Sequence, residues 1–210
     1  MSRIRSFVRG AAGRGPAAVT LLTVLFAVMA GCGGGGGGPE KPTAASLARE
    51  GWTAFEQGDL ETASARFADA LALDPEYVDA FVGQGWVAVR DRDLDVAEDR
   101  FDEALLRNAQ AIDATAGRVL IAVGRDDPAS VRDRGAVLLT GDAAYVFTHD
   151  RTFSASDVRW FMARGALSMA DYPAVVSQLD VLSPGHGLDP ASVAFVERAA
   201  ALLESLRATV

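Results

Sequence analysis

The side chains best suited to acid–base chemistry lie close together in the sequence, at His149-Asp150 and at Asp157. A carboxylate beside a histidine can orient the imidazole and stabilise its protonated form, as general-base catalysis requires. The only other histidine, His186, lies in the turn-like sequence Pro184-Gly185-His186-Gly187. This glycine-containing loop has neither the lysine nor the strand–helix context of a phosphate-binding loop. His149 is therefore the centre of any enzymatic interpretation.

These residues do not form a recognised catalytic or metal-binding pattern. The two histidines have no metal-ligand spacing, and the chain has a single cysteine, Cys32, which excludes a disulfide within the chain and a cysteine-based metal site. A histidine next to an aspartate in a loop is typical of a surface turn. We therefore expect no catalytic residue, no bound metal and no cofactor. The enzymatic alternative would gain if His149, Asp150 and Asp157 converged in a closed cleft, and would fail if they faced water.

A 34-residue repeat indicates which elements position these side chains. Residues 44–77 and 78–111 are identical at ten positions at this offset. The matches are Gly51/Gly85, Trp52/Trp86, Ala54/Ala88, Asp59/Asp93, Leu60/Leu94, Ala63/Ala97, Arg66/Arg100, Phe67/Phe101, Ala70/Ala104 and Leu71/Leu105. The shared residues are mostly small or apolar at helical spacing, as a stacked helix pair requires. Arrays of helix pairs present surfaces and rarely carry chemistry.

The repeat resembles the tetratricopeptide repeat family, whose units are pairs of antiparallel helices. In this resemblance Gly51 and Gly85 allow the helices to approach closely, and Phe67 and Phe101 fill the space between neighbours. The small contact positions of the second helices are Ala63, Ala70, Ala97 and Ala104. Gly58-Asp59-Leu60 matches the turn between helices and Pro75 the closing proline, whereas Arg92 and Ala109 replace the turn glycine and the proline in the second unit. The resemblance implies an all-α fold, a tetratricopeptide-like array of antiparallel helix pairs (an α-solenoid) with a C-terminal capping helix.

Residues 112–188 are predicted to form a degenerate helical region of the same kind. We expect helices over 112–123, from Pro128 to about 139, over 155–169 and from Pro173 onward. Ser154 and Asp157 form a capping box at the start of the 155–169 helix, with Phe153 and Val158 as its hydrophobic staple. Residues 144–148 favour an extended connection packed against the helices, without a partner strand. Residues 189–210 are predicted to form the capping helix, whose buried face would contain Val193, Val196, Ala200 and Leu203.

The N-terminus resembles a bacterial lipoprotein signal. Arginines precede an apolar run that ends at Met29-Ala30-Gly31-Cys32, and this run is short for a stable membrane anchor. The resemblance implies a signal peptide over 1–31, lipidation at Cys32 and a flexible Gly-rich tether over 32–43. The absence of Asp after Cys32 favours the periplasmic face of the outer membrane in a cell with two membranes. The alternative is an uncleaved anchor helix beside a free cysteine.

Charge narrows the possible partners. Four of the 20 basic residues and none of the 28 acidic residues precede Cys32, so the mature chain carries a net charge of −12 instead of −8. This balance argues against nucleic acid as a partner. The acidic run from Asp91 to Asp102, interspersed with Arg90, Arg92 and Arg100, is typical of a solvated helix face.

We therefore expect a membrane-anchored adaptor or scaffold of the cell envelope that holds a protein or peptide partner. Family positions predict an apolar partner-binding groove lined by Trp52, Phe55, Val82, Trp86, Val89 and Leu120, continued by Val123. Either an amphipathic helix or apolar peptide of the partner fills this groove, or the chain fills it with its own residues 144–148 or a terminal helix. Two other functions stay open. One is an envelope enzyme or solute-binding lipoprotein with a site near His149, and the other is a purely structural spacer.

Overall fold

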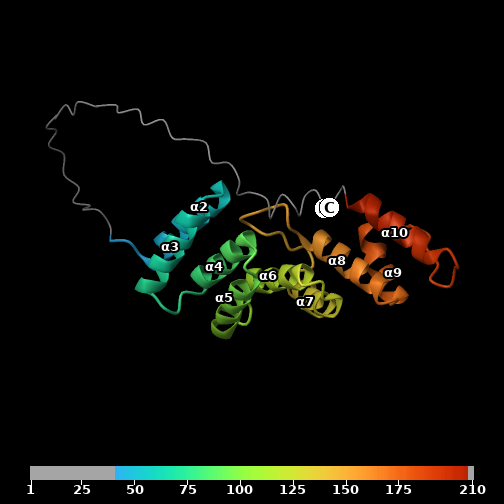
Figure 1. Cartoon of the computed structure of the whole chain (residues 1–210), viewed down its shortest axis with the longest axis horizontal. Helices are drawn as coiled ribbons and strands as arrows, with labels where there is room; N and C mark the ends of the chain where they lie inside the picture. The colour runs from blue at the N-terminus through green and yellow to red at the C-terminus, as the bar shows by residue number, and fades with distance from the viewer. Residues whose placement is uncertain (1–40, 208–210) are drawn as a thin grey trace, which may run out of the picture.

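The computed structural model describes residues 41–207, which form an arc of stacked helix pairs (Figure 1). The pairs are α2 (Ala44–Gln57) with α3 (Leu60–Leu73), α4 (Val78–Asp91) with α5 (Leu94–Arg107), α6 (Ile112–Gly124) with α7 (Pro128–Gly141), and α8 (Ala155–Ser168) with α9 (Tyr172–Leu182). Each pair packs against the next, and α10 (Phe195–Leu206) packs on α8. The predicted all-α array of helix pairs is confirmed. The signal sequence, Cys32 and most of the predicted tether lie outside the described residues.

The turn inside each pair has the same construction four times. A left-handed residue ends the first helix: Gly58, Arg92, Asp126 and Ala170 have φ between 55° and 80°. An aspartate then caps the second helix: Asp59, Asp93, Asp127 and Asp171 accept hydrogen bonds from the amides of Thr62, Val96, Ser130 and Ala174. The replacement of glycine by Arg92 therefore leaves the turn unchanged, although a non-glycine residue in this conformation costs about 1 kcal/mol.

Large rings packed against glycines hold the first three pairs together. Phe67 lies against Gly51 of its own pair and Gly83 of the next, and Phe101 lies in the same way against Gly85 and Gly117. Both rings are fully buried, as are the four predicted contact alanines, Ala63, Ala70, Ala97 and Ala104. These sequence predictions are confirmed.

The third pair is more regular than its sequence indicated. Asp74, Asn108 and Asp142 close the first three pairs, and each accepts a hydrogen bond from the amide two residues on. Asn108 thus forms the closing turn that the missing proline made uncertain.

Gly135 occupies the place of Phe101, and Met162 and Val158 of α8 fill the space above it. The linker to the fourth pair, residues 142–154, is much longer than the linkers 74–77 and 108–111.

The capping helix differs from its prediction in start and in face. It begins at Phe195, because Asp189 and Ser192 form tight turns with the amides of Ala191 and Ala194. Its buried residues are Phe195, Ala199 and Leu203, whereas Val193 and Val196 are exposed. The carbonyl of Leu203 accepts a 2.8 Å hydrogen bond from the indole of Trp160 in α8. Of the predicted face, Leu203 is buried as expected, whereas Ala200 is exposed together with Val193 and Val196. The sequence pattern therefore identified only part of the face that covers the end of the array.

Candidate functional site

The long linker, residues 142–154, folds into a strap on the inner side of the arc, and its tip reaches back toward α2 (orange in Figure 1). The Phe147 amide donates to the Phe153 carbonyl at 2.9 Å, and the Ala155 amide donates to the Tyr145 carbonyl at 2.7 Å. Val146 and Ser154 form an antiparallel bridge. The extended stretch 144–148 therefore has a partner after all: the returning arm of its own hairpin.

Alternate side chains of the strap contact successive helix pairs. The Tyr145 hydroxyl donates to Asp113 of α6 at 2.7 Å. The Phe147 ring stacks on Trp86 of α4, and the His149 ring stacks on Trp52 of α2, each with centroids 3.9 Å apart. Side chains two residues apart lie on one face of an extended chain, so Tyr145 and Phe147 contact neighbouring pairs. Thr148 and His149 form a turn, and the imidazole lies on the first pair.

The strap contacts three of the residues that were predicted to line the groove, Trp52, Phe55 and Trp86. Trp52, Phe55, Val82, Trp86 and Val89 are buried, and Leu120 is partly buried. Phe147, itself fully buried, contacts the rings of Trp52, Phe55 and Trp86. The arrangement corresponds to the second alternative, in which residues 144–148 fill the groove, and α10 lies elsewhere, on α8. A role for these residues in binding a partner stays a prediction.

The residues of the enzymatic alternative lie in separate environments. His149 Nδ1 lies 2.8 Å from Glu56 Oε1. Asp150 pairs with Arg90 at 3.1 Å, and Asp157 accepts from the amide and hydroxyl of Ser154 in the predicted capping box. These three side chains do not converge in a cleft.

His186 also makes hydrogen bonds within the structure, in the loop between α9 and α10. Its Nδ1 accepts from the Leu188 amide at 3.0 Å, and its Nε2 lies 3.1 Å from Asp180. Because Nδ1 is an acceptor, Nε2 carries the hydrogen and donates to the carboxylate. The imidazole therefore fixes the turn that precedes α10.

Arg90 fixes the strap tip, although the sequence suggested a solvated residue. Its guanidinium lies 3.6 Å from the centroid of the Phe55 ring and donates to the Phe55 carbonyl as well as to Asp150. Burial lowers the pKa of Arg90, and the Asp150 carboxylate opposes this effect. Asp150 also accepts from the amide and hydroxyl of Thr152 and so shapes the hairpin turn. No local pattern in the sequence pointed to this long-range pair.

A partly buried carboxylate lies under the base of the strap. Burial raises the pKa of Asp113, and the hydrogen bond from Tyr145 opposes this shift. Burial of the phenol raises the pKa of Tyr145, and the adjacent charge of Asp113 raises it further. The Asp113 carbonyl also accepts from the Trp86 indole at 3.2 Å. This contact cluster ties the strap to α4 and α6 together.

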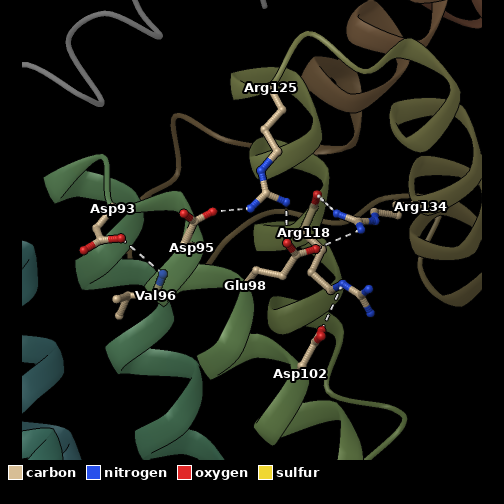
Figure 2. A network of polar contacts seen from close by, with 8 residues as sticks. All are labelled: Asp93, Asp95, Val96, Glu98, Asp102, Arg118, Arg125 and Arg134. Atoms are coloured by element: carbon tan, nitrogen blue, oxygen red, sulfur yellow. Dashed lines mark hydrogen bonds and ion pairs between the residues drawn. The ribbon is translucent and has the colours of Figure 1, made fainter.

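A second polar cluster joins the second and third pairs (Figure 2). Glu98 of α5 pairs with Arg125, just after α6, and with Arg134 of α7. Arg125 also pairs with Asp95 at 2.6 Å, and Arg118 pairs with Asp102 at 3.3 Å. The Arg125 hydrogen bond is the main cause that lowers the pKa of Glu98. Part of the predicted solvated face is thus an interface between pairs.

Neither a scan against models of protein families nor a search of curated proteins finds a match for the chain. The resemblances to tetratricopeptide repeats and to lipoprotein signals therefore stay predictions. Within residues 41–207, no helix has the length and apolar character needed to cross a membrane. The same residues contain no group of three His, Cys, Asp or Glu side chains placed to hold a metal ion.

Proposed function

We propose that this chain is a lipid-anchored tetratricopeptide-like adaptor of the bacterial cell envelope, which holds a protein or peptide partner at a membrane surface. One observation carries the proposal: within residues 41–207, four helix pairs stack into an arc whose inner side bears an extended strap. Such arrays recognise partners through a long surface. The polar residues nearest to an enzymatic pattern are engaged in holding this strap, which favours the adaptor over the enzyme.

The membrane attachment rests on the N-terminal sequence. In this proposal Cys32 carries the lipid, and the Gly-rich tether after it gives the array reach without fixing its orientation. In a cell with two membranes the array would lie on the periplasmic face of the outer membrane. No nucleic acid is expected as a partner, because the mature chain is strongly acidic.

We place the partner on the inner side of the arc, over the tip of the strap. Val146, Thr148 and Arg151 are exposed there, next to the half-buried His149 and Asp150. These residues combine an apolar, a hydroxyl and a charged group on a backbone that the buried rings of Tyr145, Phe147 and Phe153 hold in place. A preorganised surface of this kind loses little conformational freedom on binding.

Affinity capture from detergent-solubilised envelopes tests the proposal. Tagged wild-type chain should retain a partner in fixed stoichiometry. The Cys32→Ser variant, which cannot carry the lipid, should capture the same partner once the envelope is solubilised. Purification of the chain without a stoichiometric partner would contradict the adaptor function. So would an enzymatic activity of the purified chain that His149→Ala abolishes.

A further inference from the structure

We propose that the outer face of Trp52, bordered by Glu56, is a binding site for an arginine side chain of the partner, and that His149 is its internal occupant. The inference rests on the adaptor function and specifies the partner chemistry at one point of the inner surface.

The imidazole of His149 sits on Trp52 as a ligand would. The two rings are parallel within 1°, and their centroids are 3.9 Å apart. The Nδ1 atom of the same imidazole lies 2.8 Å from a carboxylate oxygen of Glu56, one helical turn after Trp52. The position therefore offers a flat aromatic surface and an anionic acceptor to one planar nitrogen-containing group.

The charges around Trp52 favour a cation at this position. The indole nitrogen of Trp52 donates to both carboxylate oxygens of Asp79, each at 3.1 Å. This contact fixes the orientation of the indole and places a second negative charge at its edge. The face of an indole attracts cations more strongly than other aromatic rings do, and Glu56 adds a direct partner at the rim.

Arginine fits this site better than lysine. Its guanidinium is planar, stacks on aromatic rings and donates in a fork that matches a carboxylate, whereas an ammonium group is a compact point charge. The protein contains such a contact three residues further along α2, where the Arg90 guanidinium lies 3.6 Å from the centroid of Phe55. An arginine on Trp52 would reproduce this arrangement with Glu56 in place of Asp150.

The imidazole of His149 can leave Trp52 while the rest of the strap stays in place. Tyr145 and Phe147 are 3% and 0% exposed, so they anchor the strap on α6 and α4. His149 is only half-buried, and its neighbours Thr148 and Arg151 are exposed. A rotation of the His149 side chain alone would therefore open the site at little cost in buried apolar area, because the Arg90–Asp150 pair still fixes the tip.

The test uses the purified full chain in detergent and follows the indole N–H signals of its three tryptophans by NMR. The probe is N-acetyl-arginine methylamide, and the control is its neutral isostere, N-acetyl-citrulline methylamide. Arginine should shift the Trp52 signal in His149→Ala with an apparent Kd at least tenfold tighter than in wild type. Citrulline should leave the signal in place. The Trp160 signal should not move, because that indole is bonded inside the α8–α10 contact.

A second substitution makes the result specific for the carboxylate. Glu56→Gln in the His149→Ala background should weaken the arginine response at least tenfold. No shift of Trp52 in His149→Ala, or equal shifts with arginine and citrulline, would overturn the proposal. His149→Gln serves as a second opening variant if the Trp86 and Trp160 signals show that His149→Ala does not fold. The NMR titration contains no partner protein, so a negative result would contradict the arginine site alone. The affinity capture tests the adaptor function separately.

Discussion

The ring of Phe101 fills the space directly above Gly117: a Cβ atom added to Gly117 would lie 2.1 Å from the Cζ atom of that ring. Both residues are buried between α5 and α6, where the ring has no open side toward which to move. Gly117→Ala should therefore destabilise the array by about 1–3 kcal/mol through overpacking, as measured by urea unfolding.

Gly141→Ala provides the matched control, since it also adds one methyl group within a helix. The added Cβ would lie 3.5 Å from Ile112, an ordinary contact distance. This variant should be neutral or more stable by up to about 1 kcal/mol, because alanine has less freedom in the unfolded chain. Equal effects of the two substitutions would show that the α5–α6 contact is misplaced.

Glu98 should stabilise the contact between the second and third pairs in a pH-dependent way. Arg125, with Arg134, lowers the pKa of Glu98, so its contribution is present above the usual glutamate pKa and is lost as the pH falls through the lowered value. Glu98→Gln should cost about 1 kcal/mol or less at pH 7 and low salt. Thermal melts should show this difference shrinking in acid and in 1 M salt. Asp99 is an exposed neighbour of Glu98. If Asp99→Asn lost as much stability as Glu98→Gln, the cause would be the net charge of the chain and not the Glu98 ion pairs.

Asp113 has the opposite dependence. Burial raises its pKa, so the folded state binds the proton more readily than the unfolded chain, and stability falls as the pH rises from the usual aspartate pKa through the raised value. Asp113→Asn keeps an oxygen acceptor for Tyr145 and removes the charge. It should raise the melting temperature at pH 7, and the gain should vanish in acid.

The Tyr145 hydroxyl provides the complementary test. Tyr145→Phe removes the donor and leaves the Asp113 carboxylate without this hydrogen bond, at a cost of about 1–3 kcal/mol at pH 7. Asp113→Asn should suppress part of this cost, because the charge that needs the donor is then absent. Additive effects of the two substitutions would contradict the coupling between strap and α6.

Lipidation at Cys32 can be tested independently of the array. The parent chain should incorporate a palmitate analogue and be cleaved before Cys32, whereas Cys32→Ser should remain unlabelled and uncleaved by the lipoprotein peptidase. Equal labelling of both chains would exclude this cysteine as the lipid attachment site.

The sequence predicted the parts of the fold that depend on local patterns. Gly58-Asp59-Leu60 predicted the turn between α2 and α3, and Ser154 with Asp157 predicted the start of α8, because these motifs act within a few residues. The capping role of Asp59 and Asp93 emerged only from the structure. The third pair was underestimated, since Gly135 replaces the expected phenylalanine and side chains from α8 take over its volume. Such an exchange between helices leaves no periodic signal.

The candidate site was largely beyond sequence reasoning for a similar reason. Tyr145 and Phe147 appeared only within the extended segment 144–148, and His149 appeared only as a candidate for acid–base chemistry. Their alignment with α6, α4 and α2 depends on tertiary packing. Arg90 and Asp150 pair across 60 positions, and Glu98 and Arg134 across 36. Local charge patterns resemble a solvated face whether or not such partners exist. The apolar composition left two occupants of the groove open, a partner or the chain itself, because a large apolar surface is seldom left exposed.

Site-specific photo-crosslinking in intact cells tests the central claim, that the inner side of the arc binds the partner. One photoreactive residue would replace exposed Thr148 on the strap, and another would replace Leu106, which is 82% exposed on the outer helix α5. The account predicts a crosslink to one identified partner from position 148 and at least tenfold less from position 106. Equal yields from both positions, or a crosslink from position 106 alone, would contradict it.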